Sequence, residues 1–202
     1  MADTLHVDFR PGSFGRTSAA PGILIREITD FALASVIARR GQVAAAAAAA
    51  ERAYGIALPN QTRLVTGYGM SFLGTGPGQW LALAAAGDPP IEAQIAAALG
   101  DTASAFDQSD SRVMLELRGP RVRDVLAKGV SVDLHPTAFA PGHVAATTVS
   151  HLAVQLWQTD TAPVYRLLGV RSYFESLWHW LAASSAEFGA QVLPPARYAA
   201  PG

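Results

Sequence analysis

A glycine-rich run at residues 74–78, Gly-Thr-Gly-Pro-Gly, has the composition of a loop that could bind phosphate through backbone N–H groups. A dinucleotide-binding G-x-G-x-x-G loop would need its third glycine at position 79, where the chain has Gln79. Pro77 removes one N–H donor, and the apolar residues that follow predict a strand where the motif requires a helix. The run therefore predicts a turn and not a phosphate site.

Histidine is the next residue type that could bind a metal ion or transfer a proton. The chain has five, and no two are spaced three or four residues apart on a predicted helix. His179 stands between two tryptophans, where a packing role is more common than catalysis. The chain has no Cys, so thiolate metal sites and disulfides are excluded. We expect no metal site at the five histidines, His6, His135, His143, His151 and His179.

Serine and carboxylate side chains give no clearer site. Ser172 and the serines at 184–185 lack the G-x-S-x-G pattern of a nucleophile elbow. Asp107, Asp110 and Asp124 are predicted to be turn and surface residues, and no two carboxylates form an evident acid–base pair. The sequence therefore predicts no catalytic, cofactor-binding or metal-binding residue in this chain.

The densest charge feature is a group of five basic residues, namely Arg112, Arg118, Arg121, Arg123 and Lys128. Acidic residues are interspersed with them, so a solvated edge of a strand and helix explains the group. A contact with another subunit is the alternative, because Arg forms planar, bidentate pairs across interfaces. Nucleic acid is disfavoured by a net charge of −1. As candidate subunit contacts we choose Arg118, Arg121 and Arg123.

The stretch 162–189 carries the strongest helix signals in the chain. Ser172 and Glu175 form an S-x-x-E pattern that predicts a capping box, and Gly189 is expected to end the helix. Its apolar residues fall on two adjacent stripes: Phe174, Trp178, Leu181 and Phe188 on one, and Tyr173, Leu177 and Trp180 on the other. Either both stripes are core, or one meets a partner protein. We choose Trp178 as core, and Trp180 and Tyr173 as candidate contacts.

The composition favours a protein with covered surface. Of the 202 residues only 15% are charged and 50% are hydrophobic, a low charge fraction for an independent soluble chain. The Ala-rich run at 43–50 is too short to span a membrane, and the first residues do not resemble a signal peptide. We therefore expect a soluble, cytoplasmic protein that binds neither membrane nor nucleic acid.

Strands and helices are expected to alternate along the chain, with hairpin-linked strands, which favours an α+β fold with antiparallel sheets and packed helices. Residues 1–21 are predicted to be an irregular arm and residues 190–202 a loose tail. Residues 22–189 form either one domain or two small lobes split near residue 100. The expected strands are 22–29, 63–69, 71–74, 79–84, 103–107, 112–118, 144–150, 153–158 and 164–170. The expected helices are 31–40, 43–53, 88–99, 120–129 and the one after Ser172.

Several stretches resemble the gamma subunit of heterotetrameric sarcosine oxidase. The most specific are Asp-Thr-Ala-Pro-Val-Tyr-Arg-Leu-Leu from Asp160, Arg-Ser-Tyr-Phe-Glu-Ser-Leu-Trp-His-Trp-Leu from Arg171, and Ala-Glu-Phe-Gly from Ala186. Leu-Arg-Gly-Pro-Arg-Val-Arg-Asp-Val-Leu-Ala-Lys-Gly from Leu117 and Gly-Gln-Trp-Leu-Ala-Leu from Gly78 extend the likeness. The family's usual Leu-Gly-Pro-x-Glu-Trp run is altered here to Gly-Thr-Gly-Pro-Gly-Gln-Trp, but no catalytic role attaches to it.

This resemblance implies a non-catalytic subunit of a complex that oxidises sarcosine to glycine. In that family the methyl carbon passes to tetrahydrofolate or leaves as formaldehyde, and oxygen is reduced to hydrogen peroxide. FAD, FMN, NAD and tetrahydrofolate are held by the larger partners, so alpha, beta and delta subunits are the implied partners and one-carbon metabolism is the implied setting. The resemblance also implies a fold similar to the folate-binding domain of aminomethyltransferases.

Two alternatives stay open. Instead of such a subunit, the chain could be a stand-alone folate-binding module of the aminomethyltransferase type or an unrelated α+β adaptor that shares helix signals. A folate site should offer a carboxylate to hydrogen-bond the pterin, and the sequence points to none. The preferred N-methyl amino acid of the complex is not specified by any residue that we identify.

Overall fold

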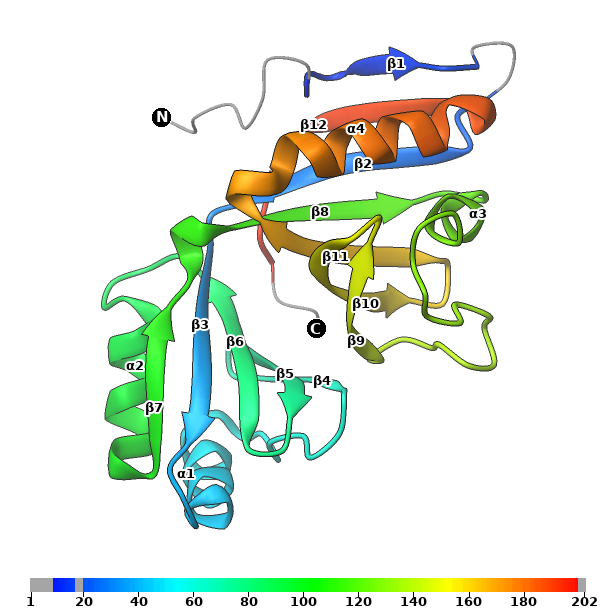
Figure 1. Ribbon diagram of the computed structural model, residues 1–202. Helices are drawn as coiled ribbons and strands as arrows, with labels where there is room; N and C mark the ends of the chain where they lie inside the picture. Colours follow the sequence, from blue (N-terminus) through cyan, green and yellow to red (C-terminus); the bar gives the residue numbers. More distant parts are fainter. Residues whose placement is uncertain (1–8, 17–19, 200–202) are drawn as a thin grey trace. The chain divides into compact units, whose positions relative to one another are not determined.

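The computed structural model describes residues 9–16 and 20–199, and the chain divides into two units (Figure 1). The first unit takes residues 1–29, 110–141 and 145–196, and the second takes 30–109, 142–144 and 197–202. Each unit has one sheet in which antiparallel pairing dominates, together with helices, which confirms the expected α+β fold. The division is not a single split near residue 100, because the first unit is assembled from segments on both sides of the second.

A seven-stranded sheet in the order β1-β12-β2-β8-β11-β10-β9 forms the first unit. Its strands are β1 (Gly12–Phe14), β2 (Ile23–Thr29), β8 (Arg112–Arg118), β9 (Val144–Val149), β10 (Leu152–Asp160), β11 (Val164–Val170) and β12 (Ala190–Arg197). Strand β8 is central, since it pairs antiparallel with β2 and with β11, and Leu117 stands opposite both Ile25 and Tyr165. The predicted alternation of β8 is confirmed, with Val113, Leu115 and Leu117 buried on one face.

Helix α4 (Phe174–Ser185) covers that face of the sheet, and the short helix α3 (Val122–Leu126) contributes to the same core (Figure 1). One-turn 3₁₀ segments, Arg171–Tyr173 and Ala186–Phe188, flank α4. The core unites α4 residues such as Leu177 and Leu181 with Leu115 and Leu167 of the sheet. Large aliphatic side chains on alternate strand positions and on one helix stripe thus bury each other.

The second unit is built on a five-stranded sheet in the order β4-β5-β6-β3-β7. Its strands are β3 (Phe31–Ala38), β4 (Leu64–Gly67), β5 (Met70–Gly76), β6 (Gln79–Ala85) and β7 (Ala103–Asp107). Its helices are α1 (Val43–Tyr54) and α2 (Ile91–Leu99), with 3₁₀ turns at Gly100–Thr102 and Ser109–Ser111. Ile91, Ile95 and Leu99 are buried, which confirms the predicted inward stripe of α2.

Strand β3 corrects the helix predicted at 31–40. Asp30 has a φ of 54° and forms a turn between β2 and β3. Strand β3 pairs antiparallel with β6 and β7, so it is an inner strand with burial on both faces. Its alanines made the segment look helical, but they pack against the alanines of α1, for example Ala34 with Ala46 and Ala50 in one core. Small side chains allow helix and sheet to approach closely, and this contact outweighs local propensity.

Both chain ends are more ordered than predicted where the structure describes them. Residues 190–197 of the expected tail form β12, the second strand of the seven-stranded sheet, because alternate residues such as Ala190 and Val192 enter the core. Residues 9–16 of the expected arm hold β1, which pairs antiparallel with β12, and Phe9 is buried. The rest of the predicted arm and tail, at 1–8, 17–19 and 200–202, lies outside the described residues.

The predicted capping box at Ser172 does not form. Helix α4 starts after Tyr173, whose side chain makes no capping hydrogen bond, and a 3₁₀ turn through Ser172 precedes it. Because Ser172 is already inside the turn, its backbone is not in the extended conformation that a capping residue needs. The end of the helical stretch is as expected: Gly189 takes a φ of 70° directly after the last 3₁₀ turn.

Candidate subunit interface

Helix α4 separates its two aromatic stripes between core and surface. Phe174, Leu177, Trp178 and Leu181 are buried in the core of the first unit. Phe9 and Phe14 of the N-terminal segment meet the edge of Trp178, at ring-centroid distances of 4.9 and 5.4 Å. The choice of Trp178 as core is confirmed, whereas its cover by the N-terminal segment was not predicted.

Tyr173 and Trp180 behave differently from each other. Tyr173 is 57% exposed at the start of α4, as a contact residue on a free surface would be. Trp180 is half-buried against the core, and its indole lies so close to Gly129 that a Cβ added there would be 2.6 Å from the ring. Trp180 is therefore part packing residue and part surface residue, and its assignment as a contact stays a prediction.

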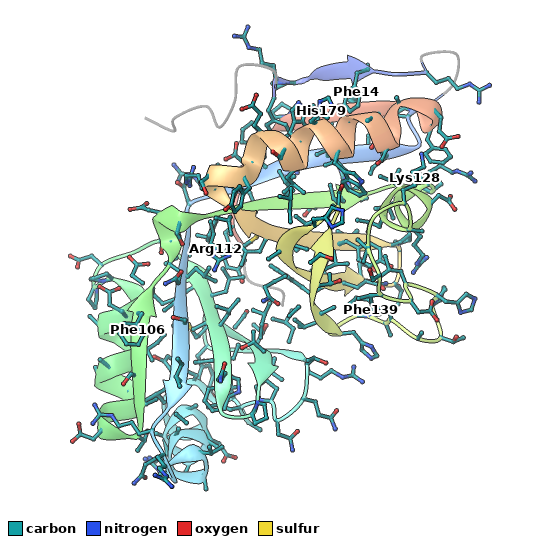
Figure 2. The ribbon with its side chains drawn as sticks, in the orientation of Figure 1. Phe14, Phe106, Arg112, Lys128, Phe139 and His179 are labelled. Carbon is teal, nitrogen blue, oxygen red and sulfur yellow. The ribbon has the colours of Figure 1, made fainter. Side chains whose placement is uncertain are left out.

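The exposed edge of Trp180 lines a groove of about 650 Å³ between α4 and the β9–β10 hairpin. The α4 side of the groove is Glu175, Ser176, His179, Trp180 and Ala183, and the hairpin side is Ser150 and Leu152. His179 is exposed on α4 in Figure 2. Ser150 and His151 have φ values of 45° and 77°, so the hairpin turns tightly and brings Leu152 to the helix. The lining of the groove combines apolar side chains, Leu152, Trp180 and Ala183, with polar ones, and protein contacts use both kinds.

The three candidate arginines do not share one surface with α4. Arg118 follows Leu117, whose side chain faces α4, so it points to the opposite face of the sheet. Its Nε is buried and makes no hydrogen bond. Arg121 is half-exposed, pairs with Asp124 at 3.1 Å and lies 4.7 Å from the centre of the Phe188 ring.

Arg123 is anchored within the fold. Its Nε donates a hydrogen bond of 3.0 Å to the hydroxyl of Tyr165, and its guanidinium lies 5.9 Å from that ring. Burial raises the pKa of Tyr165, and the Arg123 charge and hydrogen bond partly offset that rise. This hydrogen bond stabilises α3 against β11.

Lys128 ties α3 to the end of α4. Its Nζ donates to the carbonyl of Ser184 at 2.6 Å, pairs with Glu187, and lies 4.7 Å from the centre of the Phe188 ring. Figure 2 labels Lys128 in this region. Together with Arg121 it places two cations against one aromatic ring, so much of the basic group holds helices together.

A second apolar patch lies on the sheet of the second unit. Ile37 and Phe106 are 44% and 56% exposed. Phe106 of β7 stands opposite Ser35 of β3, and Ile37 is two positions further along β3, so both side chains are on one face. Figure 2 shows Phe106 on β7. Sequence reasoning missed this patch because a helix was predicted at 31–40. A strand over the same residues would have placed Leu33, Ser35 and Ile37 on one face, which was the available signal.

The turn predicted at 74–78 is confirmed only for Pro77 and Gly78, which join β5 to β6 with a φ of 67° at Gly78, whereas residues 74–76 belong to β5. Within the described ranges, no group of three or more His, Asp or Glu side chains could hold a metal ion. Among the described helices, none has the length and apolar character needed to cross a bilayer.

Comparison with known proteins decides the family. The model of the sarcosine oxidase gamma subunit family matches residues 40–187. The gamma subunit of sarcosine oxidase from Arthrobacter sp. is 36% identical over 178 residues, covering 87% of this chain and 86% of that protein. The chain belongs to the sarcosine oxidase gamma subunit family.

Other comparisons agree with membership of the gamma subunit family. The gamma subunit from Corynebacterium sp. (strain P-1) is 36% identical over 177 residues, covering 86% of this chain and 85% of that protein. A chain of the heterotetrameric sarcosine oxidase from Corynebacterium sp. U-96, in complex with pyrrole 2-carboxylate, is 30% identical with a TM-score of 0.73. That match covers 84% of this chain and 87% of the other. All five candidate contacts lie inside the range that the family model matches.

The fold has a wider distribution than the gamma subunit family. Aminomethyltransferase T of the glycine cleavage system from Bartonella henselae shares the fold with a TM-score of 0.63 at 15% identity. The match covers 87% of this chain and 48% of that protein. The expected likeness in fold to aminomethyltransferases is confirmed, and at this identity it concerns the fold alone.

Proposed function

We propose that this chain is the non-catalytic gamma subunit of a heterotetrameric sarcosine oxidase, and that it acts by assembling with larger alpha and beta subunits and with a delta subunit. The observation that carries this proposal is the identity of 36% with a curated gamma subunit along 86% of that protein's length. A likeness this long leaves little of the chain for an added catalytic module.

The proposed complex oxidises the N-methyl group of sarcosine and leaves glycine. The methyl carbon passes to tetrahydrofolate or is released as formaldehyde, and the electrons reduce oxygen to hydrogen peroxide. We place FAD, FMN, NAD and tetrahydrofolate on the partner subunits and none on this chain, in line with the lack of any cofactor motif in the sequence. We also place the chain in the cytoplasm, because a chain without Cys forms no disulfides and so needs no oxidising compartment.

The surface proposed for assembly is the outer edge of α4. Tyr173 supplies an exposed aromatic ring, and the groove beside Trp180 supplies both apolar and hydrogen-bonding side chains. Tyr and Trp are enriched among the residues that dominate binding energy at interfaces. Arg121, just before α3 in the same unit, is a half-exposed cation and remains a candidate contact. Arg118 and Arg123 are weaker candidates, because each is partly buried.

Co-expression with tagged alpha and beta chains tests assembly. Tyr173→Ala and Trp180→Ala should each reduce recovery of the chain in the complex, with a loss of affinity of about 30-fold for a residue worth ~2 kcal/mol. Phe106→Ala, on the apolar patch of the second unit, is the matched control. If Phe106→Ala weakens assembly and the α4 variants do not, the interface lies on the second unit.

The catalytic assignment has its own test. The isolated chain should be colourless and show no oxidation of sarcosine, and the reconstituted complex should be active. Stoichiometric flavin absorbance on the isolated chain would overturn the non-catalytic role.

A folate-binding module is the second candidate, favoured by the fold shared with aminomethyltransferase T. Titration of the isolated chain with tetrahydrofolate separates the two. The subunit proposal expects no saturable signal at micromolar concentration, and tight one-to-one binding would place the folate module first.

A further inference from the structure

The five-stranded sheet of the second unit has one covered edge and one open edge. Strand β4 stands at the covered edge, because Leu64 N donates to the carbonyl of Gly142 at 2.8 Å and Val144 N donates to that of Thr62 at 3.0 Å. Strand β7 stands at the other edge, next to β3 and with α2 beside it (Figure 1), and no strand of the described chain pairs with its outer side. An unpaired strand edge is a template for pairing with another chain.

Strand register identifies the open backbone groups of β7. Gln108 N donates to the carbonyl of Leu33 at 2.7 Å. Because bonded pairs alternate along an antiparallel ladder, the even-numbered residues of β7 turn their backbone groups toward β3. The odd-numbered residues turn theirs away from the sheet, and these are Ala103, Ala105 and Asp107. Within the described ranges, no backbone hydrogen bond beyond the β3–β7 ladder reaches these three residues.

Strand β7 lacks the features that usually block edge pairing, which are Lys, Pro or a bulge. Its sequence, Ala-Ser-Ala-Phe-Asp, has no Lys and no Pro, and its register with β3 is unbroken. Its one charged residue, Asp107, stands at the last position, where the carboxylate accepts two hydrogen bonds from Ser109. On the face of the sheet that carries Phe106, the exposed side chain of Ile37 extends the apolar surface. The edge therefore suits an uncharged, extended partner strand.

The geometry points to a second copy of this chain as the partner, with the two β7 strands paired antiparallel about a two-fold axis at Ala105. This register places Ala105 opposite Ala105 of the second copy and Ala103 opposite Asp107 of the second copy. All outward N–H and C=O groups of both strands are then paired. A pair centred on Asp107 would instead place two carboxylates opposite each other, which is unfavourable. Isologous contacts about a two-fold axis are the commonest kind in homo-oligomers.

The side chains on the exposed face fit the same register. Phe106 stands opposite Ser104 of the second copy, so a large side chain meets a small one. The two Phe106 residues become diagonal neighbours about 7–8 Å apart, a separation that aromatic side chains can bridge. Ile37 stands opposite Ser104 in the β3–β7 pair, so each Phe106 ring lies toward the exposed Ile37 of the other copy. The two Asp107 Cα atoms are about 14 Å apart, because four residues of about 3.4 Å separate them along the strands.

Helix α2, which shares a core with β7, carries only short side chains at its exposed positions, Ala93, Ala96 and Ala97. The contact itself is small, with a five-residue strand and two exposed apolar side chains from each copy. Stable interfaces bury about 1,200 Å² or more, so this contact should give a weak dimer. It uses a surface other than α4, so it stands or falls separately from assembly with larger subunits.

Sedimentation equilibrium of the isolated full chain tests the contact. The weight-average mass should rise from that of one copy toward that of two between about 10 and 500 µM. Ala105→Pro removes the outward N–H at the centre of the pair and no hydrogen bond to β3, and Phe106→Lys places like charges at the diagonal positions. Both variants should remain monomeric over this range. Tyr68→Lys is the matched control, because it changes an exposed aromatic residue at the β4–β5 turn and should associate as the parent chain does.

Disulfide trapping tests the register, because the chain has no Cys of its own. Under mild oxidation Ala105→Cys should cross-link two copies, since Cα atoms directly opposite in a hydrogen-bonded pair are about 5.5 Å apart, within reach of a disulfide. Asp107→Cys is the matched control. Its two Cα atoms are about twice the longest distance that a disulfide spans, so it should stay monomeric.

Three outcomes would overturn the second copy as the partner. The parent chain remains monomeric up to about 500 µM, or Ala105→Pro and Phe106→Lys associate as the parent does, or Asp107→Cys cross-links faster than Ala105→Cys. A monomeric free chain together with weaker assembly of Phe106→Ala would assign the open edge to a larger subunit instead. Urea unfolding checks that both edge variants are folded. If Ala105→Pro does not fold, Phe106→Lys and the two cysteine variants decide the question.

Discussion

Trp180 lies directly over Gly129, and its indole occupies the space that any larger residue at position 129 would need. Gly129→Ala should therefore destabilise the chain by about 1–3 kcal/mol, as overpacking of a tight contact usually does. The change is measured as the shift in the urea midpoint of unfolding.

A double-mutant cycle checks the cause of that loss. In a Trp180→Ala background the space over position 129 is open, so Gly129→Ala should cost clearly less than in the parent chain. Equal costs in both backgrounds would mean that Gly129 is needed for a backbone reason and not to accommodate the indole.

Trp178 should behave as a core residue. It is 9% exposed and meets the rings of Phe9, Phe14 and the neighbouring core. Trp178→Ala should lower the free energy of unfolding by about 3–5 kcal/mol. The exposed His179→Ala is the matched control on the same helix, expected within about 0.5 kcal/mol of the parent chain. A similar effect of the two substitutions would show that the aromatic cluster contributes little.

Glu27 should give the chain a pH-dependent weakness. Burial raises the pKa of its carboxyl above the ordinary value of 4.5, and the Arg171 charge offsets only part of that rise. The folded state then binds the proton more tightly than the unfolded state, so stability declines as pH rises from about 4.5 through the folded-state pKa. Glu27→Gln removes this titration. The free energy of unfolding of the variant minus that of the parent chain should therefore be more favourable at pH 7 than at pH 4.

Urea unfolding at the two pH values measures this difference. Glu51→Gln, on the exposed face of α1, is the matched control. If both variants change stability with pH in the same way, burial at Glu27 is not the cause.

Ser109 should act on acid stability in the opposite sense. Its hydroxyl donates to Asp107 at 2.6 Å and its N–H donates at 2.8 Å, which lowers the pKa of Asp107 below its ordinary value. That stabilisation is present above the unfolded-state pKa and is lost as pH falls through the folded-state pKa. Ser109→Ala should therefore lower the free energy of unfolding at pH 7. The difference in that free energy between variant and parent chain should become smaller in acid, as measured by urea unfolding. It also removes an acceptor from the Leu33 N–H. A pH-independent loss would assign the whole effect to Leu33.

Much of the fold could be predicted from sequence because local pattern and tertiary role agree. The alternation of Val113, Leu115 and Leu117 predicts a strand, and these residues form the buried face of β8. The spacing of Ile91, Ile95 and Leu99 predicts a helix, and these residues form the buried stripe of α2. The prediction failed at β3, where alanines favour a helix locally but fill a narrow gap between sheet and helix.

Strand β12 could not be predicted, since Pro194 and Pro195 argue against a strand. They are tolerated because β1 pairs only with residues 190–192, before the prolines. The site was predicted in part: the burial of Trp178 followed from its stripe, but its cover by Phe9 and Phe14 depends on contacts between residues far apart in the chain.

The position of β12 has a consequence for the order of events during synthesis. Gly22 N donates to the carbonyl of Gly189, and Thr29 Oγ1 donates to that of Ala196, so β2 and β12 lie side by side in the same direction. The ribosome delivers β2 more than 160 residues before this neighbour. The sheet of the second unit, made wholly from residues 31–107, is complete long before then. The nascent chain therefore carries an open strand edge at β2 through most of translation, which makes that edge a natural point of contact for a chaperone.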